Sequence, residues 1–192
     1  MDTTSTPTSD TATLLRAAVF AARVHAGHRR KGASAEPYVN HVLEVAQILA
    51  AHGAPAEAVI AGLLHDTVED SDKDPEPVTH AQLVSEFGEA VARLVAEATD
   101  DKALPKETRK ALQVKHAPAK SDGAKMLKLA DKISNLRAIL ASPPAGWDHA
   151  RRVEYVGWAG RVAAGLKGVS PSLDALFDAT YRGAMARLAS ET

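Results

Sequence analysis

The stretch 62–70 limits what this chain can fold into more than any other segment. It reads Gly-Leu-Leu-His-Asp-Thr-Val-Glu-Asp and follows an apolar run, and its ligand-type side chains are His65, Asp66, Glu69 and Asp70. Read as a helix at about 100° per residue, all four fall within an arc of roughly 140°. Three carboxylates beside an apolar helix face need a cation to hold them, because burying unpaired charge is costly. A solvated acidic helix end is the simpler alternative, but carboxylates favour a helix N-terminus over a C-terminus.

The rest of the chain favours helices over strands. It is rich in alanine and leucine, only 4% of its residues are aromatic, and no segment alternates as a strand does. Glycine, proline and capping residues divide it into helical segments at about 14–26, 41–52, 55–70, 80–87, 89–98, 105–115, 123–140, 148–166 and 171–189. We therefore predict an all-α fold, one compact bundle of about eight to ten helices over residues 12–192. Residues 1–11 are Thr, Ser, Asp and Pro with almost nothing apolar, and are expected to be a disordered tail.

Composition excludes several classes of protein. The net charge is −1 and aromatics are few, so nucleic acid is not an expected partner. The chain has no cysteine, which rules out disulfides and zinc–thiolate sites and fits a reducing compartment. No apolar run reaches membrane-spanning length, and the N-terminus lacks a signal-peptide pattern. We expect a soluble, cytoplasmic protein without a membrane partner, and a homo-oligomer is left open.

Two further residues have metal-ligand chemistry in apolar helical settings. His41 begins a predicted helix, and Asp131 lies in the middle of the long helix, where Asp is a poor helix former. Alone, His41 reads as a hydrogen-bonded cap and Asp131 as the partner of a nearby lysine. Together with His65 and Asp66 they make two imidazoles and two carboxylates, a set that suits Mn²⁺, Fe²⁺ or Zn²⁺ better than Ca²⁺.

The same residues lie in segments that resemble a known family. Arg30-Lys31 with residues 37–41, residues 65–70, and residues 128–137 resemble, in this order, the hydrolase domain of RelA/SpoT proteins, a branch of the HD-domain metal phosphohydrolases. Residues 99–102 and 146–159 are similar to the stand-alone, metazoan-type SpoT homologues, the small alarmone hydrolases. The resemblance runs from about residue 14 to 185. It departs at His28, where the family often has Gln, and at Val42, where it usually has Pro.

This resemblance implies an HD-domain bundle and a reaction. The reaction is hydrolysis of the 3′-pyrophosphate of the alarmone guanosine tetra- or pentaphosphate, giving GDP or GTP, with one Mn²⁺ per chain. The resemblance implies that the metal ligands are His41, His65, Asp66 and Asp131. It implies that Glu69 and Asp70 orient or deprotonate the attacking water, although support of the ligand His65 or simple solvation is their alternative role. Near the nucleotide substrate it places Arg30, Lys31, Lys102, Asn135, Arg151 and Tyr155, each of which alone reads as surface charge or packing.

Two alternatives stay open at the level of sequence. The same centre suits other phosphorylated nucleotides, including the 2′-phosphate of NADPH, and the leaving group distinguishes these reactions. A helical module that senses a nucleotide without catalysis is the second alternative, but a sensor has no need to retain every ligand and both water-side carboxylates.

Overall fold

A computed structural model describes residues 10–72 and 74–191. Within these residues the chain forms α-helices, one short 3₁₀ helix and isolated bridges, but no strand. The elements are α1 (Asp10–Val24), α2 (Val39–Ala51), α3 (Ala56–Leu64), α4 (Thr67–Asp70), α5 (His80–Phe87), α6 (Glu89–Ala98), α7 (Lys106–His116), η1 (Ala117–Ala119), α8 (Asp122–Ala141), α9 (His149–Leu166) and α10 (Pro171–Ala189). The predicted all-α class is confirmed. None of these helices combines the length and apolarity needed to cross a bilayer.

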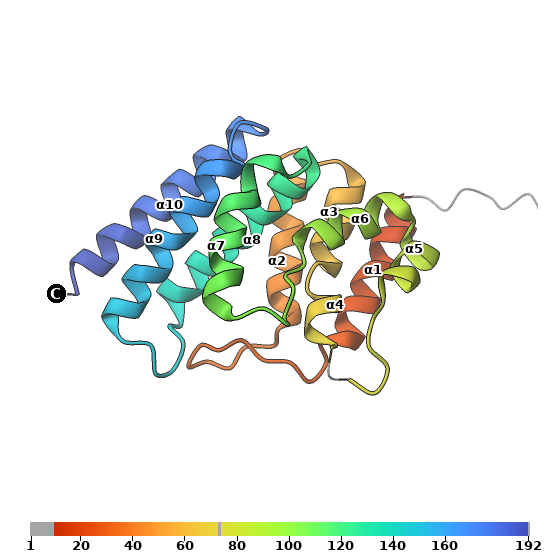
Figure 1. The fold of residues 1–192 in the computed structure, drawn as a ribbon, viewed down its shortest axis with the longest axis horizontal. Helices are drawn as coiled ribbons and strands as arrows, with labels where there is room; N and C mark the ends of the chain where they lie inside the picture. The colour runs from red at the N-terminus through yellow and green to blue at the C-terminus, as the bar shows by residue number, and fades with distance from the viewer. Residues whose placement is uncertain (1–9, 73, 192) are drawn as a thin grey trace, which may run out of the picture.

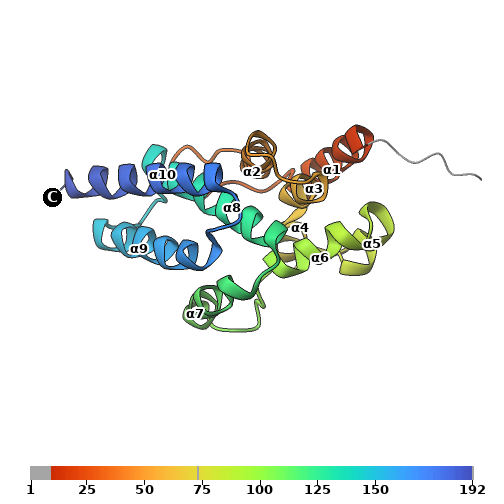
Figure 2. The same ribbon diagram turned by 90° about the horizontal axis from the view of Figure 1, so that it is seen from above.

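Helix α8 lies at the centre of the molecule. It packs against α2, α3, α6, α9 and α10, and Figure 2 shows it between the α9–α10 pair and the helices of the N-terminal half. Most of its residues from Ala124 to Ile139 are buried, since apolar side chains occur on every face of the helix. Four of the buried residues are polar: Lys128, Asp131, Lys132 and Ser134. The core helix therefore carries charge into the interior.

Several predicted helix starts are correct because a side chain caps them. Thr79 accepts a hydrogen bond from the backbone N–H of Gln82, and Ser170 accepts one from that of Leu173. At α8 the cap is Ser121, so this helix begins at Asp122, one residue before the predicted start at 123.

Two starts differ from the prediction. Helix α1 begins at Asp10, so Asp10 and Thr11 are helical and not part of the expected tail; the rest of that tail lies outside the described residues. Helix α2 begins at Val39 and not at the predicted residue 41. Asn40, which would be the cap of a helix starting at residue 41, donates its side chain to Glu36 Oε1 instead.

The connections that carry candidate site residues lie along one edge of the molecule. Figure 1 shows the α1–α2 loop, α4 and the α8–α9 loop along the same edge of the bundle. The α1–α2 loop is held against the end of α8 at Gly32, where an added Cβ would lie 2.4 Å from the carbonyl oxygen of Ser142. Glycine is therefore required for this close approach, which fixes the basic loop beside the C-terminus of the core helix.

Candidate metal centre and active site

The stretch 62–70 is not the continuous helix that we predicted. Helix α3 ends at Leu64 and α4 begins at Thr67, with His65 and Asp66 between them. Asp66 has φ −98° and ψ −4°, the bridge region in which many active-site residues lie. Side chains bind the carbonyl groups that the break leaves free: Thr67 Oγ1 donates to Leu64 and His65 Nδ1 to Gly62. The break is thereby stabilised, and it turns His65 and Asp66 toward α8.

Both histidines are oriented by a hydrogen bond at Nδ1. His65 Nδ1 lies 2.9 Å from the Gly62 carbonyl, which only accepts, so this nitrogen carries the proton. His41 Nδ1 lies 2.8 Å from Ser134 Oγ, whose own proton goes to Glu44 Oε2 at 2.6 Å. His41 Nδ1 is therefore the donor as well. In each neutral ring, Nε2 keeps the lone pair that a metal needs.

The four predicted metal ligands converge. His41 Nε2 lies 3.6 Å from Asp66 Oδ2 and 3.4 Å from Asp131 Oδ1. His65 Nε2 lies 3.0 Å and 3.9 Å from the same two oxygens, and it is buried without a hydrogen bond of its own. Two imidazole nitrogens and two carboxylate oxygens thus meet from α2, the α3–α4 break and α8. This donor set and its unpartnered nitrogen fit a divalent cation.

The charges in this centre need a positive partner. Burial opposes ionisation of Asp66, but His65 and His41 hold its pKa well below the ordinary range. Burial likewise opposes ionisation of Asp131, and Lys132, His41 and Lys128 hold its pKa low. Burial disfavours a charged His65, yet the two carboxylates outweigh it and raise its pKa to about 9. The proton on His65 therefore supplies positive charge that a divalent cation would replace.

Supporting contacts around the carboxylates were not all foreseen. The Tyr38 hydroxyl donates to Asp66 Oδ2 at 2.7 Å, and Asn135 Nδ2 donates to Asp131 Oδ1 at 2.6 Å. Lys132 Nζ lies 2.9 Å from Asp131 Oδ2, so the ordinary ion pair considered for this Asp exists alongside its place in the centre. Asn135, predicted above only to lie near the substrate, thus contacts the ligand candidate Asp131 directly. Tyr38 and Ser134 lie inside the motifs quoted above, but their hydrogen bonds join segments that are distant in the chain, so no local pattern predicts them.

Glu69 and Asp70 follow the centre on α4. The pKa of each carboxyl is raised, first by burial and then by the nearby Asp66 carboxylate. Lys102 donates to the backbone carbonyl of Glu69 and lies 3.7 Å from Asp70 Oδ1, while Arg109 lies 3.7 Å from Glu69 Oε1. These partly buried carboxyl groups hold a proton more readily than exposed ones, and each lies near a cationic side chain.

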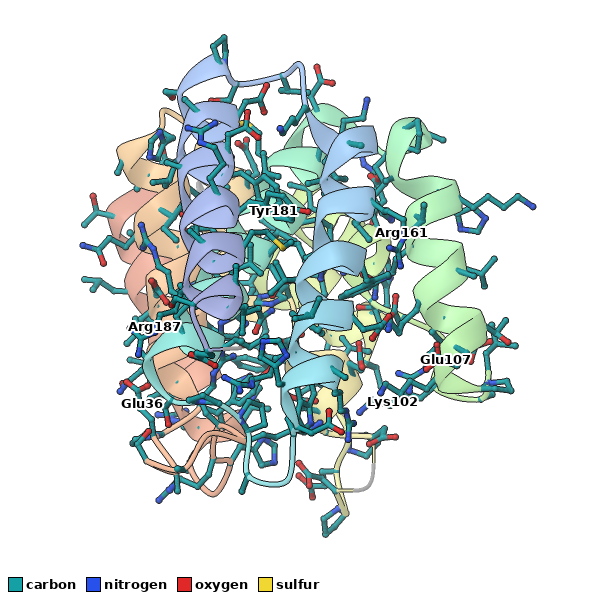
Figure 3. All side chains as sticks on the ribbon, turned by 90° about the vertical axis from the view of Figure 1, so that its left-hand side faces the viewer. Glu36, Lys102, Glu107, Arg161, Tyr181 and Arg187 are labelled. Carbon is teal, nitrogen blue, oxygen red and sulfur yellow. The ribbon has the colours of Figure 1, made fainter. Side chains whose placement is uncertain are left out.

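The remaining substrate candidates lie at different distances from the centre. Arg30 Nη2 donates to Asn135 Oδ1 at 3.1 Å, which links the basic loop to Asp131. A cavity of about 230 Å³ lies beside His41 and is lined in part by Arg30 and Arg137. Lys31 is exposed on the same loop. Figure 3 shows Lys102 at the same end of the molecule as Glu36 of the α1–α2 loop.

Arg151 and Tyr155 form a separate aromatic group on α9. The Arg151 guanidinium lies 4.5 Å above the Trp147 ring, and the Tyr155 ring lies 5.4 Å from Trp147 and 5.2 Å from Trp158. Burial raises the pKa of Tyr155, with nearby Lys132 acting in the opposite direction. Within the residues that the structure describes, Arg151 makes no hydrogen bond or ion pair with the four converging ligands.

The fold and the two-imidazole, two-carboxylate centre are those of an HD-domain protein, and the family model described as "HD domain" matches residues 17–159. Comparison with known proteins narrows this class. The human guanosine-3′,5′-bis(diphosphate) 3′-pyrophosphohydrolase MESH1 is 48% identical over 86% of this chain and 91% of its own. The Xenopus tropicalis MESH1 is 45% identical over 88% and 93%. The chain therefore belongs to the MESH1 family of HD-domain proteins.

A solved structure agrees with this placement. It is described as a metazoan ortholog of SpoT that hydrolyses ppGpp and has a role in starvation responses. It superposes with a TM-score of 0.84 at 38% identity, over 93% of this chain and 98% of its own. The likeness extends over nearly the whole of both chains.

Proposed function

We propose that this protein hydrolyses the 3′-pyrophosphate of guanosine tetra- or pentaphosphate, giving GDP or GTP and pyrophosphate, and so degrades the alarmone of the stringent response. The observation that carries the proposal is the convergence of four ligand atoms, with nitrogen–oxygen separations of 3.0 to 3.9 Å. The human and Xenopus relatives are named for this reaction. We assign the reaction to one domain spanning residues 12–192, and we propose the cytoplasm as its compartment because the chain has no cysteine.

We assign the metal to His41, His65, Asp66 and Asp131, with Mn²⁺ as the ion. Two imidazoles and two carboxylates suit Mn²⁺ and leave coordination positions free. A divalent cation bound there supplies Lewis-acid activation of water and of a phosphoryl oxygen. Tyr38, Asn135 and Lys132 hold the carboxylates in place through the hydrogen bonds described above.

We assign proton transfer to Glu69 and Asp70. Their raised pKa makes either carboxylate a better base than an exposed one. The attacking water gives up a proton to this pair, and its oxygen forms a bond to the first phosphorus of the 3′-pyrophosphate. The bond between that phosphorus and the ribose 3′ oxygen breaks, and the 3′ oxygen takes up a proton. One water is consumed, and pyrophosphate and a 3′-hydroxyl are formed.

We assign substrate binding to the cations and aromatic rings around the centre. Arg30, Lys31 and Lys102 would neutralise phosphate charge, and the arginine fork suits two phosphate oxygens at once. Tyr155 and the Arg151 side chain beside Trp147 offer flat surfaces on which a purine base can stack. The substrate is therefore a small phosphorylated nucleotide.

A substrate panel with product identification tests the proposal. Purified protein stripped of metal is assayed with guanosine tetraphosphate and with NADPH, with and without added Mn²⁺. We expect Mn²⁺-dependent release of pyrophosphate and GDP, and loss of the activity in Asp66→Ala and Asp131→Ala. Undiminished turnover in either variant or without metal would refute the metal assignment. Orthophosphate release from NADPH in place of pyrophosphate release would refute the substrate.

A further inference from the structure

A second group of metal-ligand side chains lies beside the proposed centre. His25, His28 and Asp70 each offer one ligand atom, and the three atoms lie within 4.8 Å of one another. His25 follows α1, His28 lies in the α1–α2 loop and Asp70 ends α4. Neither His25 nor His28 belongs to the four converging ligands. The group thus joins the segment that follows α1 to the end of α4, two parts of the chain that are distant in the sequence.

The two imidazoles face each other at a distance that suits ligation. Their Nδ1 atoms are 3.1 Å apart. Nitrogens bound to one zinc at about 2.0–2.1 Å, with angles of about 90–110°, lie roughly 2.9–3.4 Å from each other. A hydrogen bond between the rings is the alternative, and it uses one proton between two nitrogens. The distance alone fits both arrangements.

The surroundings of the group favour a cation. His25 is 1% exposed, and its Nδ1 lies against the Nδ1 of His28, away from bulk water. Burial lowers the pKa of His25 to about 4, so its ring is neutral at pH 7 and keeps a lone pair. The Asp70 side chain is 29% exposed, so ions reach the group from solvent on that side. Tyr38 lies between this group and the centre of four converging ligands: its ring centroid is 4.9 Å from that of His25 and 5.5 Å from that of His41.

We propose that His25, His28 and Asp70 form a second divalent-cation site that takes Zn²⁺. Two imidazoles and one carboxylate, with further positions left to water, are a ligand set that Zn²⁺ commonly adopts. An ion there engages Asp70, which the proposed function uses as a water-side carboxylate. Zinc at this site therefore inhibits hydrolysis, a consequence that rests on the proposed function, whereas the site itself does not.

Metal stoichiometry tests the site without reference to activity. Metal-free protein is titrated with Zn²⁺ by calorimetry, and bound zinc is measured by elemental analysis. We expect two zinc ions per chain in the wild type, one in His28→Gln and one in Asp131→Asn. His116→Gln, at an exposed histidine of α7, is the matched control and keeps two. One ion in the wild type, or two in a folded His28→Gln, overturns the site; thermal unfolding verifies that each variant is folded.

Inhibition tests the consequence separately. Hydrolysis by Mn²⁺-loaded enzyme is measured at increasing Zn²⁺ concentration, and each rate is taken relative to that variant's own zinc-free rate. We expect the Zn²⁺ concentration that halves the rate to be at least about tenfold lower in the wild type than in His28→Gln. If the wild type binds two zinc ions but is half-inhibited at the same Zn²⁺ concentration as His28→Gln, the inhibitory role is overturned. If guanosine tetraphosphate is not a substrate, the stoichiometry still decides the site, so failure of the two proposals is distinguishable.

Discussion

Replacing Ser134 by alanine is expected to weaken metal binding without touching a ligand. Ser134 Oγ lies 2.8 Å from His41 Nδ1 and donates to Glu44 Oε2 at 2.6 Å. His41 and Ser134 are 3% and 1% exposed, so no bulk water replaces the lost hydroxyl. Glu44 keeps its second partner, Arg137, at 2.9 Å. The main loss is therefore at His41, whose buried N–H has no acceptor and whose ring loses its fixed tautomer.

The magnitude follows from these contacts. Leaving one buried donor unsatisfied costs about 1–3 kcal/mol of folding stability. Removing a hydrogen-bond partner of a metal-ligating histidine typically lowers metal affinity by about 10–100-fold, or roughly 1.4–2.8 kcal/mol. Mn²⁺ affinity is measured by calorimetry or chelator competition, and stability of the metal-free protein by urea unfolding.

A second serine–histidine pair provides the control. The Ser172 hydroxyl lies 3.0 Å from His52 Nδ1 at an exposed position. Ser172→Ala is expected to leave Mn²⁺ affinity unchanged and to alter stability by no more than about 0.5 kcal/mol. Wild-type Mn²⁺ affinity in Ser134→Ala, with its stability reduced, would show that His41 does not depend on this hydroxyl for its orientation as a ligand.

Three other predictions follow from the same geometry. Glu69→Gln is expected to keep bound Mn²⁺ while kcat falls by about 10²–10⁴-fold, because it removes a proton acceptor; loss of metal would make Glu69 a ligand instead. The pKa of His65 is raised from 6.5 to about 9, so its charge stabilises the metal-free fold below pH 6.5 and this contribution is lost as pH rises through 9. Urea midpoints are expected to fall across that window in the wild type and not in His65→Gln, and a flat wild-type profile contradicts this. Gly32→Val is expected to push the α1–α2 loop off Ser142 and raise KM by about tenfold or more with metal retained; an unchanged KM means that the loop does not position Arg30.

The sequence predicted helices well where a local signal ends or begins them. Thr79 and Ser170 cap helices that begin at the predicted residues 80 and 171, because a cap needs only residues close in the chain. It missed the break at His65 and Asp66, since a near-helical turn keeps the helical spacing of apolar residues. The hydrogen bonds from His65 and Thr67 that stabilise this break are visible only in three dimensions.

In the candidate centre, too, the ligand residues could be predicted from the sequence, but the contacts that orient them could not. Resemblance to a family named four residues, and the structure brings those four together. The Ser134 hydroxyl that orients His41 lies 93 residues away from it, and no local pattern encodes that contact. His25 and His28 are three residues apart, a spacing that a search for histidine pairs would find, but Asp70 joins them only through the fold. Their assignment as a site, like that of the substrate contacts, stays a prediction.

The position of Lys132 gives the protein a built-in optical reporter. Its ammonium is paired with Asp131 and lies 4.8 Å from the Trp158 ring centroid, and the chain has only two tryptophans. A cation drawn to Asp131 redistributes charge next to that indole, whose emission wavelength responds to nearby charge. Intrinsic fluorescence, read on unlabelled protein, is therefore expected to follow loading of the centre in real time.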